Sequence, residues 1–285
     1  MVVALAKVAV GFVSGVLSGM FGIGGGLITT PAIRLLLGYP ALIAVGTPLP
    51  VILPGALTGA ASYRRRGLTD IRAGVLMGAI GAVGSVGGAF LSQRVGGTVV
   101  LIATAALIGW AATDMLMQHR VALRSDARAA AEAGSSSGAA TGENESDEAI
   151  AAPLPGPFEV PHRFVRLAAI GMLAGVYSGF LGLGGGFVVV PALTRYLGMP
   201  VKKAIGTSLV TVAVLAIPGT ITHYFLGHID PWLALLLAVG VVPGAVLGAR
   251  LTRSASDRTI RLAFAALLAV VGVWLAVSEI AAMRP

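Results

Sequence analysis

The sequence predicts an all-helical protein that crosses a membrane several times and is built from two homologous halves. Of its 285 residues, 56% are hydrophobic and only 11% are charged, whereas a soluble domain carries about 25% charged residues. The charges are clustered, so long stretches contain no Asp, Glu, Lys or Arg. These stretches match the roughly 20 apolar residues that one membrane helix needs: 41–63, 73–93, 95–113, 167–194, 204–229, 231–249 and 262–278.

The two halves are an internal repeat. A shift of 160 residues aligns Gly11–Leu91 with Gly171–Leu251 without a gap. The best-matched stretches read GVLSGMFGIGGGLITTPAIRLLLGYP from Gly15 and GVYSGFLGLGGGFVVVPALTRYLGMP from Gly175. Aligned Gly, Pro, Thr and Asp residues are not what chance similarity between apolar segments produces. The chain is therefore a duplicated unit.

Each half is expected to contain the same elements in the same order. It opens with an apolar stretch, 2–37 or 167–197, that is too long for one crossing and is interrupted by glycines and a proline. We expect a helix, a break and a shorter helix there, which together form a glycine-broken helical hairpin. Three spans follow in each half, near 41–62, 73–92 and 97–117, and near 204–226, 231–249 and 260–280.

Residues 118–162 lie between the halves and have a different composition. They are rich in Ala, Gly and Ser, carry acidic residues and prolines, and lack apolar periodicity. Such a composition does not bury enough apolar surface to fold. We expect a disordered cytoplasmic linker, with a solvated tether favoured over a partner-binding segment. The predicted organisation is a first membrane repeat at 1–117, the linker at 118–162 and a second repeat at 163–285.

The basic loops predict that the halves insert in opposite orientations. In the first half, arginines 64, 65, 66 and 72 follow the second element, but the equivalent loop 223–230 has no Lys or Arg. The second half carries its arginines one loop later, at 250, 253, 258 and 261. Because basic loops face the cytoplasm, this offset indicates an inverted repeat with an odd number of crossings per half. Both termini would then lie outside. The parallel arrangement is disfavoured because it places these later arginines, with Lys202 and Lys203, outside.

The glycine clusters are the main candidate site. Nothing around them fits a nucleotide-binding loop, since no strand precedes and no acidic residue follows at the required spacing. Gly11, Gly15 and Gly19 lie on one helix face and suit close helix packing. Consecutive glycines instead break a helix at membrane depth, where protein or a water-filled cavity must satisfy the backbone. The helix that starts after each break would offer free amides to an anion. The expected substrate-binding glycines are Gly24, Gly25, Gly26, Gly184, Gly185 and Gly186.

Hydroxyl groups extend this candidate site. Thr47 and Thr207 occupy aligned positions, and Ser208 follows the second of them. A membrane threonine often donates a hydrogen bond to a carbonyl of its own helix. The aligned repetition of these threonines supports a substrate-binding role to the same degree as that structural role. The nearby prolines 48, 50, 54 and 218 predict kinks that open a cavity or a hinge.

The remaining polar residues suggest no other chemistry. Asp70 and Asp230 lie near expected helix starts and are read as caps rather than proton carriers. Arg34 and Arg195 are read as interfacial anchors. His223, which replaces Tyr63 of the first half, is titratable but is weak support for a site on its own. There is no Cys, and no span contains a carboxylate pair, a metal-ligand cluster or a nucleophile with a base. We therefore expect no enzyme activity, no metal and no cofactor.

The duplicated signature resembles that of the sulfite exporter TauE/SafE family of membrane transporters. It reads G-x-x-S-G-x-x-G-x-G-G-G with a later proline, at Gly15–Pro31 and Gly175–Leu193, and is joined by Gly46-Thr47 and Gly206-Thr207. The first copy has Ala32-Ile33 where leucine is expected, a minor departure. The resemblance covers both halves and implies transport of sulfite, sulfonates or other small organic anions.

The predicted function is thus secondary transport of a small anion, a sulfite, sulfonate or related organosulfur anion, across the inner membrane. The alternatives are a non-transporting membrane scaffold and a transporter of small carboxylates. Expected partners are the anion and the lipid bilayer. A coupling ion, either proton or sodium, and a homo-oligomeric state are left open. Nucleic acid is not expected, because no basic patch is interleaved with stacking aromatics.

Overall fold

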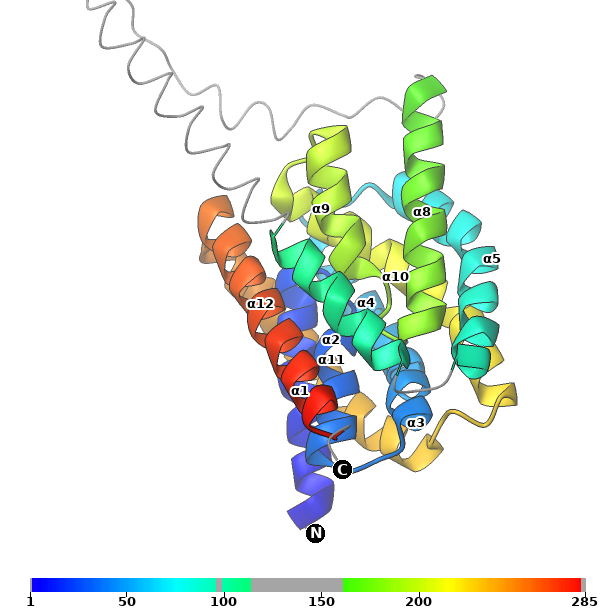
Figure 1. Cartoon of the computed structure of the whole chain (residues 1–285). Helices are drawn as coiled ribbons and strands as arrows, with labels where there is room; N and C mark the ends of the chain where they lie inside the picture. The colour runs from blue at the N-terminus through cyan, green and yellow to red at the C-terminus, as the bar shows by residue number, and fades with distance from the viewer. Residues whose placement is uncertain (1, 96–98, 114–160, 283–285) are drawn as a thin grey trace, which may run out of the picture.

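The computed structural model describes residues 2–95, 99–113 and 161–282, and in these residues it is helical throughout apart from turns and loops. The first half contains α1 (Val2–Phe21), α2 (Gly26–Pro31), η1 (Ala32–Leu36), α3 (Ala41–Gly46), α4 (Pro48–Arg64) and α5 (Ile71–Val95). The second contains α8 (Pro161–Leu181), α9 (Gly186–Leu197), α10 (Val201–Phe225), α11 (Pro231–Ser254) and α12 (Asp257–Ala282) (Figure 1). A shorter apolar helix spans Val99–Thr113. The predicted all-helical class is confirmed.

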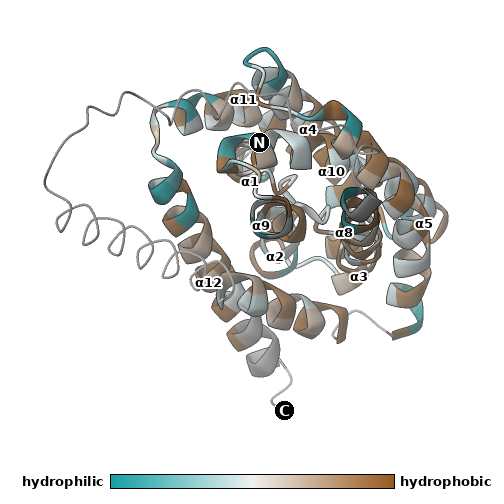
Figure 2. Ribbon diagram, turned by 90° about the horizontal axis from the view of Figure 1, so that it is seen from above, coloured by the Kyte–Doolittle hydropathy of each residue, from teal (hydrophilic) through white to brown (hydrophobic). Residues whose placement is uncertain are grey.

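Six helical segments within the described residues are long and apolar enough to cross a membrane: Val3–Phe21, Ala41–Arg64, Ile71–Val95, Arg163–Leu181, Val201–Phe225 and Pro231–Ser254. Large apolar side chains point outward from them, for example Phe90, Leu235 and Val239. Brown, the colour of apolar residues, accordingly dominates the ribbons in Figure 2. The chain is a multi-pass membrane protein, and these outward side chains face lipid.

Both expected hairpins are present. In each half a long first helix ends just before the glycine cluster, and a shorter helical segment, Gly26–Leu36 or Gly186–Leu197, follows it. The second hairpin begins at Pro161, so α8 includes the last two residues of the segment expected to be the linker. Residues 114–160 of that segment lie outside the described part of the chain.

The two halves exchange partners. α1 packs along α11, and α8, which is equivalent to α1, packs along α5, which is equivalent to α11. Glycines permit this close approach: Gly11, Gly15 and Gly19 rest on the α11 backbone at Leu237, Val241 and Ala245. Their equivalents Gly171, Gly175 and Gly179 rest on the α5 backbone at Met77, Gly81 and Ser85. The small-residue face predicted for the first helix is confirmed, and its partner comes from the other half.

The order of these contacts gives the directions of the helices. Gly59 on α4 meets Leu209, and Gly219 on α10 meets Leu49. The equivalent helices α4 and α10 therefore run antiparallel. In Figure 1, α1 begins at the bottom and α8 begins at the top, in agreement with this arrangement.

Proline interrupts one helix of the pair. The first half divides into α3 and α4 at Thr47, immediately before Pro48, whereas α10 continues through the equivalent Thr207 and Ser208. Proline lacks the amide that would continue the helical hydrogen bonds. The interruption expected from the prolines is thus present at Pro48, while Pro218 lies inside the continuous α10.

Candidate functional site

The glycine breaks adopt a backbone conformation that other residues avoid. Gly22, Gly24 and Gly25 have φ values of 72°, 77° and 89°, and their equivalents Gly182, Gly184 and Gly185 have values of 68°, 80° and 71°. An L-residue with a Cβ loses roughly 1–2 kcal/mol in this left-handed region. Three glycines per break therefore allow the chain to leave α1 or α8 and begin the next helix within four residues.

The two breaks lie against each other. A Cβ at Gly26 would meet the carbonyl of Gly182 and Leu183, and a Cβ at Gly186 would meet the carbonyl of Gly22 and Ile23. The segments therefore cross antiparallel. We call residues 22–26 and 182–186 together the crossing. The two glycine breaks are therefore in contact, and substrate binding by Gly24–Gly26 and Gly184–Gly186 stays a prediction.

Two aliphatic side chains, related by the repeat, close over the crossing. A Cβ at Gly24 would lie 2.5 Å from Val212 Cγ1 and 3.1 Å from Ile52 Cγ2. At Gly184 the same two side chains would lie 3.1 Å and 2.9 Å away. Ile52 and Val212 thus occupy the middle of the protein from α4 and α10, where they limit the space beside the breaks.

The crossing carries a concentration of backbone donors. In the described part of the chain the amides of Gly22 and Gly182 bond the carbonyls of Ser18 and Ser178, and the amides of Ile28 and Val188 bond Gly25 and Gly185. The amides between these, at 23–27 and 183–187, donate to no described backbone carbonyl. Buried amides need a partner, and an anion is one partner that such amides can share.

Thr47 and Thr207 do not point their hydroxyl oxygens at the glycines. Thr207 Oγ1 accepts the Asp70 amide at 2.9 Å, and Thr47 Oγ1 accepts the Asp230 amide at 3.1 Å. Each threonine therefore holds the loop that starts a long helix of the opposite half. Because accepting an amide leaves the O–H able to donate, their role as anion ligands stays a prediction.

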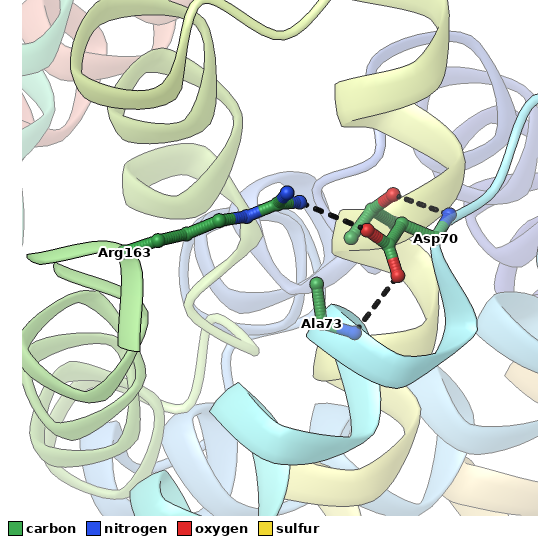
Figure 3. A network of polar contacts seen from close by, with 4 residues as sticks. Asp70, Ala73 and Arg163 are labelled. Atoms are coloured by element: carbon green, nitrogen blue, oxygen red, sulfur yellow. Dashed lines mark hydrogen bonds and ion pairs between the residues drawn. The ribbon is translucent and has the colours of Figure 1, made fainter. Parts of the chain in front are cut away.

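The aspartates that supply those amides are helix caps, as predicted. Asp230 Oδ1 accepts the amides of Trp232 and Leu233, and Asp70 Oδ1 accepts that of Ala73. Asp70 has an additional partner, since its second carboxylate oxygen lies 3.2 Å from Arg163 Nη2 of α8 (Figure 3). This ion pair is largely buried, so it ties the start of the second half to the α4–α5 loop.

Buried serines also surround the crossing, among them Ser14, Ser18, Ser178 and Ser208. Ser208 Oγ donates to the Gly22 carbonyl at 2.9 Å, which links α10 to the first break. Ser18 and Ser178 are fully buried, and their hydroxyls have no hydrogen-bond partner in the structure. The two serines occupy the same position of the duplicated signature. Ser18 lies close to the first break, since its Cβ is 3.7 Å from a Cβ built on Gly25. The sequence prediction passed over them, although their duplication was visible.

The described residues contain no group of three or more His, Cys, Asp and Glu side chains arranged to hold a metal ion. A cavity of about 580 Å³ lies between α4 and α11, with Arg65, Arg66 and Arg250 among its lining residues. A smaller one of about 340 Å³ lies where α4, α10 and α11 meet, lined in part by Pro50, Tyr224 and Pro231. The first cavity belongs to the strongly basic end of the protein.

Comparison with known proteins gives a consistent result. The family profile described as sulfite exporter TauE/SafE matches residues 7–275. The probable membrane transporter protein YunE of Bacillus subtilis (strain 168) is 25% identical over 281 residues, 93% of this chain and 94% of its own. A probable membrane transporter protein of Xylella fastidiosa (strain 9a5c) is 26% identical over 268 residues, 93% of this chain and 90% of its own. The probable membrane transporter protein MamO of Magnetospirillum gryphiswaldense is 29% identical over 91% of this chain but 43% of its own length. No solved structure matches the chain.

Proposed function

The chain belongs to the sulfite exporter TauE/SafE family of membrane transporters, and we propose that it carries a small sulfur oxyanion, a sulfite or sulfonate, across the inner membrane. The transport is secondary, since the sequence contains no nucleotide-binding motif. The anion binds at the crossing of the two glycine breaks, and the driving force is an ion gradient or the gradient of the anion itself.

The donors of the crossing are the observation that carries this proposal. The amides of 23–27 and 183–187 have no described backbone acceptor, and the two nearby serine hydroxyls, Ser18 and Ser178, have no partner at all. All of these groups are neutral donors contributed equally by both halves. A substrate that must leave as well as enter is better served by such donors than by a buried Arg or Lys, whose full charge would hold the anion.

The groups proposed to bind the anion are backbone amides and side-chain hydroxyls. The amides of Gly24–Gly26 and Gly184–Gly186 and the hydroxyls of Ser18 and Ser178 donate to the anion, with Thr47 and Thr207 as further candidates. Ser208 positions Gly22 through its hydrogen bond. Ile52 and Val212 must move or rotate as substrate passes, because they pack on the glycines of both breaks.

The distribution of charge over the two ends orients the protein. The end at which α5, α8, α10 and α12 begin carries most of the basic residues: Arg64, Arg65, Arg66, Arg72, Arg163, Arg166, Arg195, Lys202, Lys203, Arg250, Arg253, Arg258 and Arg261. The opposite end has Lys7, Arg34 and Arg94 among the described residues. By the positive-inside tendency, the basic end is cytoplasmic, so the two halves insert in opposite orientations and α1 begins outside.

The test is a flux panel in proteoliposomes with sulfite, alkanesulfonates, sulfate and small carboxylates. We expect the sulfur oxyanions with a single negative charge to move fastest. Ligand-dependent thermal stabilisation of the purified protein, which binding produces by mass action, separates a transporter from a scaffold. If no anion moves or stabilises the protein while a cation or a neutral solute does, the proposed function is wrong.

Two serine variants make the assay specific for the crossing. Ser18→Ala and Ser178→Ala remove hydroxyls that hold nothing in the structure, so the fold should not weaken. A hydrogen bond to a charged group is worth about 1.5–3 kcal/mol, and each variant should therefore bind the anion roughly tenfold or more weakly. Ser92→Ala is the control, because the Ser92 hydroxyl is buried but bonded to the Ala89 carbonyl, and it should transport normally.

A further inference from the structure

The structure pairs His223 with a second histidine that the sequence comparison did not connect to it. His223 Nδ1 lies 3.1 Å from His228 Nδ1, and both side chains are buried. His223 Nε2 lies 2.8 Å from the Gly179 carbonyl of α8. In the first half the equivalent positions hold Tyr63 and Leu68, and Tyr63 bonds the Gly19 carbonyl in the same way. The histidine pair is thus confined to one end of a nearly symmetric protein.

The contacts fix where protons sit. A carbonyl accepts only, so His223 Nε2 carries a hydrogen, and the Nδ1 of neutral His223 is an acceptor. The short Nδ1–Nδ1 contact then requires a hydrogen on His228 Nδ1. His228 Nε2 is then the one ring nitrogen of the two histidines whose lone pair of electrons takes part in neither hydrogen bond. One proton can be added there without breaking either hydrogen bond, whereas a second would place two N–H groups face to face. The pair therefore has a capacity of one proton.

The histidine pair contacts residues close to the second glycine break and residues next to Thr47. Gly179 lies three residues before the second break, beside Ser178 of the signature. On the other side, the His228 backbone packs directly on Gly46, next to Thr47, whose hydroxyl holds Asp230 of the same loop. A charge placed on His228 thus acts on the contact between the α10–α11 loop, the end of α8 and the start of α4.

Few other ionisable groups surround the pair. α8 presents the Gly179 carbonyl and α3 the Gly46 backbone. Asp230 follows in the same loop, with its carboxylate engaged by the amides of Trp232 and Leu233. The described hydrogen bonds of the two imidazoles join them to each other and His223 to Gly179, and none comes from Tyr177 on α8 or Arg94 on α5. Burial lowers the pKa of His228 from its ordinary value of 6.5, so the proton enters from an acidic side and leaves readily.

We propose that the His223–His228 pair is the coupling-proton site of this transporter, and that one proton on His228 Nε2 accompanies each monovalent anion. The proposal rests on the proposed anion transport. The pair lies at the end opposite the basic one and so faces the outside, which is the acidic side of the membrane in a respiring cell. In the transport cycle His228 gains the proton as the anion occupies the crossing and releases it with the anion on the other side, so no net charge moves.

The test is concentrative uptake driven by a pH gradient in proteoliposomes. An alkanesulfonate is the probe, because it stays ionised, whereas sulfite takes up a proton itself. With an acid exterior and a gradient of about one pH unit, one-to-one coupling accumulates the sulfonate up to roughly tenfold inside, since a tenfold ratio corresponds to the free energy of that gradient. The variant His223→Tyr with His228→Leu copies the Tyr63 and Leu68 pair that already packs at the other end, so it should fold.

The variant should lose accumulation, with a ratio near one, while exchange of labelled for unlabelled sulfonate at equal pH continues. The control Tyr63→Phe, which removes the equivalent hydrogen bond at the basic end, should accumulate sulfonate like the wild type. Accumulation by the double variant at the wild-type level would overturn the proposal. If no sulfonate moves even in the wild type, histidine NMR of the substrate-free protein still decides. The pair must take up one proton as the pH is lowered, and the absence of any histidine titration over the pH range in which the protein stays folded rejects the proposal.

Discussion

Gly24→Ala tests whether the crossing of the two breaks is as tightly packed as the structure shows. The added Cβ would lie 2.5 Å from Val212 Cγ1 and 3.1 Å from Ile52 Cγ2, and φ at this position is 77°. Two penalties therefore apply. The left-handed backbone costs an L-residue about 1–2 kcal/mol, and forcing a methyl group into a filled space costs about 1–3 kcal/mol more.

Gly38→Ala separates these penalties. Gly38 has a similar φ of 70°, but a Cβ there meets nothing within 4 Å. It carries the backbone penalty alone, so Gly24→Ala should be less stable than Gly38→Ala by about 1–3 kcal/mol. The measurement is thermal or denaturant unfolding of both variants in the same detergent, together with anion flux, which Gly24→Ala should reduce and Gly38→Ala should leave near normal.

A double variant identifies the neighbour responsible. Val212→Ala removes the methyl groups that clash with the new Cβ, so Gly24→Ala and Val212→Ala together should be more stable than the sum of the two separate losses predicts. Equal stability of Gly24→Ala and Gly38→Ala, or strict additivity of the double variant, would refute the packing deduced for the crossing.

Three further predictions concern the loops and the ends. Thr47→Val and Thr207→Val each leave a partly buried amide of the opposite half without its acceptor, and each should lower the free energy of unfolding by about 1 kcal/mol. Thr30→Val removes a hydroxyl without a partner and should not lower it, and denaturant unfolding compares the three variants. Arg65 and Phe225 occupy equivalent positions of the two halves in a chain without native Cys. An impermeant thiol reagent added outside should label Phe225→Cys but not Arg65→Cys, and labelling of both variants would contradict opposite insertion. Burial lowers the pKa of His228, so the contribution of its neutral form to stability is complete above pH 6.5 and is lost as the pH falls below that value. The apparent melting temperature of the wild type should therefore drop more between pH 7 and 5 than that of His228→Leu. Parallel curves of melting temperature against pH would show that His228 is not buried as described.

Local features of the fold were predictable because they depend on residues close together in the chain. The long apolar stretches gave the membrane helices, since crossing a bilayer sets a minimum apolar length. The glycine clusters gave the breaks, because only glycine adopts three left-handed conformations in four residues without strain. Asp70 and Asp230 were recognisable as caps from their places before helices. The repeat then guaranteed that each feature occurs twice.

The composition of the site was only partly predictable. The two glycine breaks are in contact, but Thr47 and Thr207 accept amides from the opposite half instead of turning their oxygens to the glycines. Ser18 and Ser178 were visible in the signature, yet nothing local distinguishes a hydroxyl without a partner from one bonded to its own helix. That distinction depends on which neighbours the tertiary packing supplies.

The sequence alone determined that this protein is a duplicated, glycine-broken helical membrane protein, and its signature resembled that of an anion transporter family. Only the tertiary structure decided that α1 pairs with α11 and α8 with α5, that the two breaks cross antiparallel, and that His228 reaches His223. The physical reason is that a repeat specifies two copies of the same surface without specifying whether each copy packs on its own half or on the other. That choice is made by the sum of long-range contacts, which close glycine packing across the halves favours here.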